Sequence, residues 1–320
     1  MCVIILSVRF NIQKRKNKKN RKQRGVFMSF ITHLINGISL GSVYAIIALG
    51  YTMVYGIAKM LNFAHGDVIM IGGYVIFTLM SGLGFNPFIS VIIAMAVCTV
   101  LGVLIEMFAY RPLRGASPLA VLITAIGVSY LLQNIALLIF GTDTKSFSTV
   151  VPVKAVKLAG DELVIKGETI VTIVTCMVII IALSLFIKKT KAGRAMLAVS
   201  EDKGAAQLMG INVNATIALT FAIGSGLAAI AGALLCSAYP ALTPYTGSMP
   251  GIKAFVAAVL GGIGSIPGAF IGGILLGVIE NLGKAYISSE MADAIVFGVL
   301  IVVLLVKPTG ILGKNIQEKV

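Results

Sequence analysis

The chain has 320 residues, of which 58% are apolar and only 12% are charged, and its mean hydropathy is +1.00. A typical soluble domain is about 45–50% apolar and about 25% charged, so this chain has too few charges to cover a water-facing surface. The composition therefore excludes a soluble enzyme, although 26 Lys and Arg against 12 Asp and Glu give a formal charge of +14.

Residues 1–27 form a strongly basic tail. Nine of the 26 basic residues lie before Met28 and no acid accompanies them, so the tail contributes +9 and residues 28–320 contribute +5. We expect the tail to be untranslated, because Met28 begins the first apolar segment and a purine-rich run encoding Arg24 and Gly25 would look like a ribosome-binding site. The alternatives are a tail on anionic lipid or on nucleic acid; we expect no nucleic-acid partner.

Long charge-free runs fill the rest of the chain. They occupy 25–58, 68–105, 115–142, 169–187, 204–252 and 254–279. A helix needs about 20 apolar residues to cross about 30 Å of hydrocarbon, whereas membrane β-strands would alternate apolar and polar residues. The sequence predicts an all-α fold, a polytopic membrane helical bundle of eight or nine transmembrane segments. The predicted spans are 30–50, 62–82, 88–109, 117–140, 169–187, 214–237, 252–264, 267–283 and 290–306.

The seventh and eighth predicted spans are short and rich in glycine. They meet at GGIGSIPGAFIGG, from Gly261 to Gly273. Apolar segments interrupted by Gly and Pro are typical of discontinuous membrane helices. We therefore expect a short or re-entrant helix pair near 252–283.

Basic residues in the loops predict the orientation, because Lys and Arg favour cytoplasmic loops. They cluster at 111–114, 188–194 and 307–314, whereas acids balance the lysines of 141–168. Counting back from 111–114 places the start of the first span outside, which conflicts with a cytoplasmic basic tail.

The sequence predicts two further parts after the basic tail. Residues 28–313 form one transmembrane domain, and 314–320 form a C-terminal tail.

Several kinds of site are missing from the sequence. There is no GxxxxGK[ST] phosphate loop, and two histidines are too few for a multi-histidine metal site. We expect neither catalytic nor metal-binding residues, so any energy coupling must come from an ion gradient or from a partner.

A long polar loop, residues 188–213, separates two predicted spans. Ser200 is a plausible helix N-cap, with Glu201 and Asp202 in the first turn, where the helix dipole favours acids. Gly210 is a plausible end of this helix. A short, capped, partly apolar helix suits docking into a groove of a partner, and the alternative is a helix that lies on the membrane.

Sequence motifs along the chain point to a known family. The spacing of Ala205, Ala206 and Gly210 resembles the cytoplasmic coupling loop of ABC importer permeases. The blocks that carry a wider resemblance are NGISLGSVYAIIALGYTMVYGIAKMLNFAHGD, RPLRG, GRAMLAVSEDKGAAQLMGIN, FVAAVLGGIGSIPGAFIGGILLGVIE and KPTGILG. Together they resemble a branched-chain amino acid ABC permease of the LivH type over essentially 30–313. The departures are the extension before Met28, and Lys203-Gly204 where relatives often have a proline and an acid.

The resemblance implies a permease subunit in the bacterial cytoplasmic membrane, not an enzyme. The implied partners are a second homologous permease, two ABC ATPases that bind the ATP, an extracytoplasmic solute-binding protein and the lipid bilayer; no cofactor is implied for this chain. Ala205, Ala206 and Gly210 would pack against the ATPase, with Glu201 and Asp202 making polar contacts. The alternatives are a urea or short-amide permease of the same family, an ion-coupled amino acid transporter, and a passive channel.

Few polar residues are candidates for a translocation path. Asn62, His65 and Asp67 follow a predicted helix break, and broken membrane helices offer backbone groups to a zwitterion. The alternative is that Asn62 or Asp67 caps the second helix at the interface. Gly262 and Gly264 join this path as a mobile break, because glycine relieves backbone constraint.

Three other ionisable positions are expected near the ends of spans. We expect Glu106 to reach the interface and pair there with Arg111. Glu280 and Asp293 are expected to lie at the ends of their spans.

Overall fold

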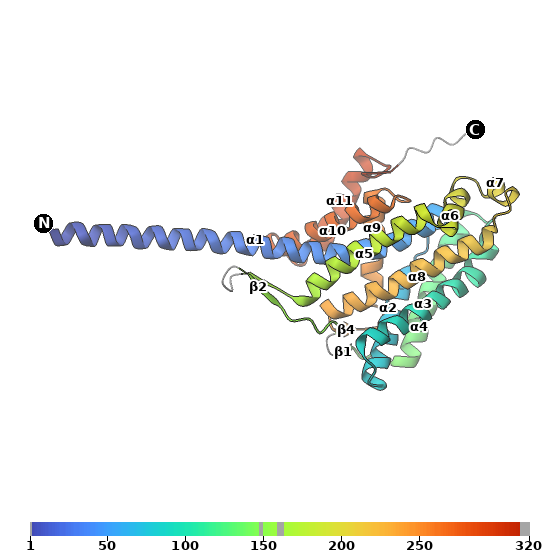
Figure 1. Ribbon diagram of the computed structural model, residues 1–320, viewed down its shortest axis with the longest axis horizontal. Coiled ribbons are helices and arrows are strands. Elements are labelled where there is room, and N and C mark those ends of the chain that lie inside the picture. The colour runs from blue at the N-terminus through green and yellow to red at the C-terminus, as the bar shows by residue number, and fades with distance from the viewer. Residues whose placement is uncertain (1, 147–149, 159–162, 314–320) are drawn as a thin grey trace.

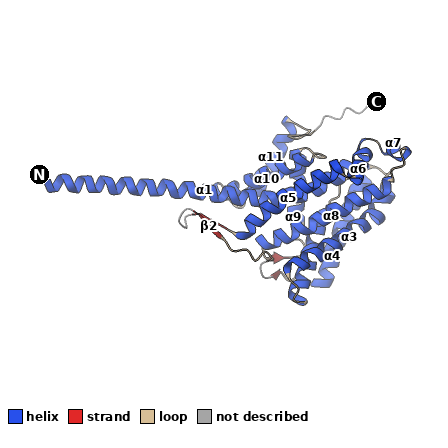
Figure 2. Cartoon of the chain, in the orientation of Figure 1, coloured by secondary structure: helices blue, strands red, loops and turns tan. Residues whose placement is uncertain are grey.

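Helices make up nearly all the regular structure in the computed structural model, which describes residues 2–146, 150–158 and 163–313 (Figures 1 and 2). The helices are α1 Cys2–Ala58, α2 His65–Phe77, α3 Pro87–Ile105, α4 Pro118–Phe140, α5 Gly167–Lys189, α6 Lys191–Glu201, α7 Lys203–Leu208, α8 Val213–Ala238, α9 Ser248–Gly261, α10 Ile266–Tyr286 and α11 Ala292–Val306. A π-helical segment, Thr78–Gly82, continues α2, and a second, Glu106–Tyr110, continues α3 into a 3₁₀ turn, Arg111–Leu113. The predicted all-helical class is confirmed.

Two short antiparallel strand pairs lie in the loops. The strands are β1 Lys145–Ser146, β2 Val156–Leu158, β3 Leu163–Ile165 and β4 Ala241–Leu242. Strand β1 pairs with β4, and β2 pairs with β3. They join loops and contribute no sheet to the core.

Polar caps with proline in the first turn start three of the helices. Asn86 accepts a hydrogen bond from the Phe88 amide (2.9 Å) before α3, and Ser117 and Ser265 cap α4 and α10 in the same way. Proline fits there because the first helical amides lack intrahelical partners. The predicted starts at 88, 117 and 267 lie within one residue of the observed ones.

Six helical segments within the described residues are long and apolar enough to cross a membrane. They are Phe27–Ala58, Pro87–Leu113, Pro118–Phe140, Gly167–Lys189, Val213–Ala238 and Ile266–Tyr286. Two shorter apolar helices, α9 and α11, have 14 and 15 residues. The predicted count of eight or nine crossings and the re-entrant pair stay predictions. The expectation that 267–283 is short is corrected, because α10 has 21 residues.

The bundle has a buried centre and an apolar outer layer. Most of residues 40–58 of α1 and most of α8 are buried, whereas α4 and α5 leave most of their apolar side chains at least partly exposed, with Leu138 on α4 reaching 87% exposure. Lipid tails are the natural cover for such faces. The two ends of the bundle differ: α6 and α7 lie at one end, and α1 enters from the other (Figure 1). This relative placement agrees with the loop count, which put the start of the first span and the 188–213 loop on opposite sides.

Glycines let α1 and α10 pack with their backbones in contact. A methyl group added at Gly277 would collide with the backbone of Gly41, and one added at Gly273 would lie 2.5 Å from the Ala45 Cα. Small residues permit such close approach between membrane helices, where no hydrophobic effect drives association.

We predict that Gly277→Ala destabilises the protein by about 1–3 kcal/mol, because the added methyl must push α1 and α10 apart. Gly298→Ala on α11 is the matched control, since nothing lies within 4 Å of the methyl it adds. Alanine favours a helix interior over glycine by about 1 kcal/mol, so the control should be neutral or stabilising. Thermal unfolding of the purified protein measures both, and equal melting temperatures would contradict the packing argument.

Candidate functional site

The loop between α5 and α8 folds into two capped helices. The Thr190 hydroxyl accepts a hydrogen bond from the Gly193 amide (2.9 Å) at the start of α6, and Asp202 Oδ1 accepts one from the Ala205 amide (2.9 Å) at the start of α7. The predicted cap is corrected: Ser200 and Glu201 end α6, and Asp202 is the N-cap. Its carboxylate fits there because the first amides of α7 have no other partners.

Helix α7 exposes apolar side chains at the end of the bundle. Leu208 is 90% exposed and Met209 is 83% exposed, whereas Ala206 is buried within the loop. Gly210 follows with a φ of +81°, and the Ile211 amide donates to the Ala206 carbonyl (3.0 Å). Gly210 therefore ends the helix as predicted, since a left-handed residue there is favoured as glycine. Glu201, Ala205 and Gly210 lie on the exposed surface.

Lys203 ties α7 to the end of α1. Its Nζ donates to the carbonyl of Ala58 (3.0 Å), the last residue of α1. A cation is favoured at the negative end of a helix dipole. Burial lowers the pKa of Lys203, and the nearby charges of Arg114 and Lys59 lower it further. Lys203 lies where the sequence departs from the pattern it resembles, and its side chain makes a specific contact between the loop and the membrane bundle.

A buried carboxylate joins the end of α3 to the start of α8. Glu106 is fully buried and pairs with Arg111 (2.8 Å) and with Arg114, which also donates to Asn214. The predicted pairing of Glu106 with Arg111 is confirmed. Its expected place at the interface stays a prediction, and the structure adds that two guanidinium groups satisfy the carboxylate inside the protein.

The predicted helix break lies between α1 and α2, at 59–64. The Tyr110 hydroxyl donates to Asn62 Oδ1 (3.0 Å), and His65 packs edge-on against Tyr51 with 4.8 Å between ring centroids. Neither Asn62 nor Asp67 caps α2, since the N-cap is Ala64 and makes no side-chain hydrogen bond. The capping alternative is therefore wrong.

Asp67 connects α2 to two other helices. It accepts hydrogen bonds from Ser129 and from Gln133 Nε2 (2.9 Å), and Gln133 also donates to Ser248 (3.2 Å). The network joins α2, α4 and α9, and it satisfies a buried carboxylate in a place where an unpaired one would be costly.

Gly262 and Gly264 form the turn between α9 and α10. Their φ angles are +102° and +94°, which glycine adopts without strain. Gly264 approaches Gly56 in the last turns of α1, and Gly262 lies against Gly313. The turn therefore lies at the end of α1 that Lys203 contacts.

A second charged cluster lies in the other half of the bundle. Glu280 is 1% exposed and accepts hydrogen bonds from Lys253 (2.9 Å), Lys284 (2.5 Å) and Tyr44 (2.8 Å). Lys253 also pairs with Asp293 (2.6 Å). The expected place of Glu280 near the end of its span stays a prediction, and the structure adds that α1, α9 and α10 enclose the side chain. One sequence signal could have indicated this cluster: Lys253 is the single charge that separates the charge-free runs 204–252 and 254–279.

Comparison with known proteins identifies the family of this chain. The family model described as "Branched-chain amino acid transport system / permease component" matches residues 33–304. The chain belongs to this family. The resemblance predicted from the sequence motifs is confirmed, and the protein is a permease component with a bundle of apolar helices.

Curated relatives of this permease match over nearly their whole lengths. It is 46% identical to the high-affinity branched-chain amino acid permease LivH of Salmonella typhimurium, covering 92% of this chain and 99% of that protein. It is 46% identical to BraD of Pseudomonas aeruginosa, covering 91% and 98%. A probable LivH of Methanocaldococcus jannaschii is 31% identical, covering 88% and 91%.

We predict that Lys203→Met loosens α7 in this permease, because the carbonyl of Ala58 loses its partner. A hydrogen bond to a charged group contributes about 1.5 kcal/mol or more, so amide exchange over 203–208 should rise about tenfold. Lys203→Arg should restore protection, and Lys191→Met, an exposed lysine on α6, should change nothing. Unchanged exchange in Lys203→Met would show that the contact does not hold α7.

Proposed function

We propose that this chain is the transmembrane permease subunit of an ATP-driven ABC importer for branched-chain amino acids. The proposal includes a second homologous permease, two ABC ATPases, a solute-binding protein outside and the bacterial cytoplasmic membrane around the bundle. The family match over residues 33–304 and the relatives' names support the substrate class.

The observation that carries the proposal is the exposed pair Leu208 and Met209 at the C-terminal end of the capped helix α7. A helix of six residues that ends in two exposed apolar side chains is too small for an interfacial membrane anchor, which needs an extended apolar face. Two apolar side chains beside Gly210 instead suit insertion into a groove of a protein partner. An ATPase in that position would act on α7, and through Lys203 on α1.

ATP hydrolysis in the partners would then drive alternating access. Helix α7 is held by its caps and by the contact between Lys203 and Ala58, so a displacement of its docking surface moves the end of α1. Ala205 and Gly210 leave room for close packing, and Glu201 adds a charge at the edge of the surface. Asp202 acts as the cap of α7, and Ala206 acts in the internal packing of the loop.

Uptake of labelled leucine by the reconstituted complex tests the function. We expect leucine to accumulate in proteoliposomes only when ATP is supplied on the α7 side. Valine and isoleucine should compete, and urea should not. Accumulation driven by an imposed ion gradient without ATP would support the secondary transporter, and urea uptake would support the short-amide permease.

The docking role of α7 makes a separate prediction. Leu208→Glu with Met209→Glu should weaken ATPase binding by about 30-fold or more, because truncating or charging a buried anchor costs over 2 kcal/mol. Leu83→Glu is the control. Leu83 is also exposed, but it directly follows the π-helical segment that continues α2, at the end of that helix away from the α1–α2 connection. Co-purification of the ATPases measures both variants, and full binding by the double variant would contradict docking through α7.

A further inference from the structure

The cluster around Glu280 lies far from the proposed docking helix α7. It lies near the C-terminal ends of α8 and α10, whereas α7 precedes the start of α8. Helix α8 has 26 residues and is about 39 Å long, so the cluster and α7 occupy opposite ends of the bundle.

Stability alone is a poor reason for such a cluster. Removing charges from water costs several kcal/mol per ion, and a buried ion pair is often no more stable than apolar residues of the same volume. Ionisable groups within membrane segments usually serve a function. Glu280 and Lys253 are both buried, and most of the other residues of their helices, α10 and α9, are apolar.

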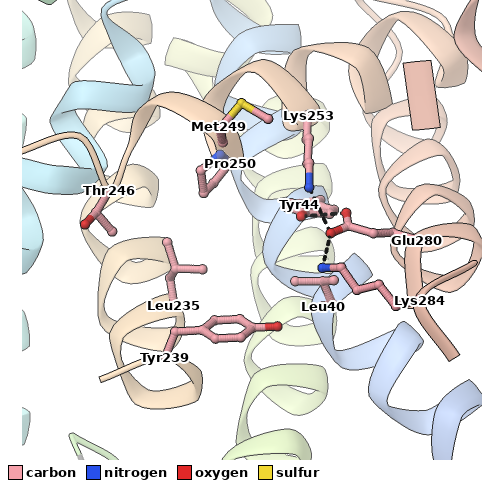
Figure 3. Close-up of a pocket in the computed structure, with 10 residues that line it drawn as sticks. All are labelled: Leu40, Tyr44, Leu235, Tyr239, Thr246, Met249, Pro250, Lys253, Glu280 and Lys284. Carbon is pink, nitrogen blue, oxygen red and sulfur yellow. Dashed lines mark hydrogen bonds and ion pairs between the residues drawn. The ribbon is translucent and has the colours of Figure 1, made fainter. Parts of the chain in front are cut away.

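An open cavity of about 240 Å³ lies directly beside the cluster. It is lined by Leu40, Tyr44, Leu235, Tyr239, Thr246, Met249, Pro250, Lys253, Glu280 and Lys284. Figure 3 shows the charged groups gathered on one side, with Leu235, Tyr239 and Thr246 across from them. Pockets for drug-sized ligands measure about 300–1,000 Å³, so this one suits a smaller molecule. One wall is charged and the rest is mostly apolar.

The charges of the cluster are balanced, which restricts what the cavity can accept. Two lysines, 253 and 284, face two carboxylates, 280 and 293. An added ion of either sign would leave an unpaired charge in a partly buried place, which is costly. A zwitterion adds one positive and one negative group together, so it can enter while every charge keeps a partner.

Lys284 is the group that can exchange partners. Its side chain is 37% exposed, and Glu280 is its one carboxylate partner within the described residues. Lys253 is held by both Glu280 and Asp293. If a ligand carboxylate pairs with Lys284, Glu280 Oε1 loses one of its hydrogen-bond donors, and the ligand ammonium can take the place of that donor.

We propose that this cavity binds a zwitterionic α-amino acid with an aliphatic side chain. The carboxylate pairs with Lys284, the ammonium pairs with Glu280, and the side chain lies against Leu40, Leu235 and Met249. The proposal rests on the proposed function and adds to it a substrate site within the permease, at the end of the bundle away from the ATPases.

Equilibrium binding to the full chain in lipid nanodiscs tests the site. The probe is labelled L-leucine, and the competitors are L-leucinamide, which lacks the carboxylate, and 4-methylpentanoate, which lacks the ammonium. We expect both competitors to bind at least about tenfold more weakly than leucine, because each forfeits a charge-assisted hydrogen bond.

Variants identify the groups. Lys284→Met should weaken leucine binding about tenfold or more but should not weaken leucinamide binding, because leucinamide has no carboxylate for Lys284 and its ammonium can take the place of Lys284 on Glu280. Lys284→Arg should restore most of the leucine affinity. Lys166→Met is the control, because Lys166 is also an exposed lysine paired with a glutamate, Glu168. Met249→Trp should fill the cavity and abolish binding, whereas Met291→Trp, at an exposed methionine outside the cavity, should not.

The outcomes separate this site from the transport function. If leucine binding is absent, or is equal in wild type and Lys284→Met, the site is wrong, whatever the uptake assay shows. If ATP-driven uptake fails while binding follows Lys284 and the two competitors as expected, the site stands and the transport function is wrong.

Discussion

The backbone contact between α1 and α10 is the constraint on which the position of the Glu280 cluster in this permease depends. Gly41 on α1 meets Gly277 on α10, and Ala45 meets Gly273, without intervening side chains. One turn of α1 along from Gly41, the Tyr44 hydroxyl reaches Glu280. If bulkier residues stood at the contact, the carboxylate on α10 and its donor on α1 would lie too far apart for a hydrogen bond.

Helix α1 also gives the two ends a continuous connection. Its last residue, Ala58, accepts the hydrogen bond from Lys203, and Tyr44 lies 14 residues earlier, about 21 Å along the axis. Packed helices transmit displacement because their cores have little free volume. A movement of α7 therefore has a direct mechanical route along α1 to the Glu280 cavity.

Polar networks set the relative positions of helices that apolar packing would leave less specified. Glu106 holds the end of α3 to α8 through Arg114 and Asn214, and Asp67 holds α2 to α4 and α9 through Gln133. Both carboxylates have their hydrogen bonds satisfied inside the protein, which is the condition for placing such groups within a membrane bundle.

The sequence by itself determined the helical class, the family, most helix starts and the capped loop with its end at Gly210. These follow from signals in the chain itself: charge-free runs for the helices, sequence motifs for the family, and a glycine at the end of the loop helix. Only the tertiary structure decided which polar residues meet. Tyr44, Lys253 and Glu280 are separated by up to 236 positions, and Asp67 and Gln133 by 66, so no local pattern pairs them. The exposure of Leu208 was likewise decided by the folded structure, because burial is a property of a residue's neighbours in the fold and not of the residue itself.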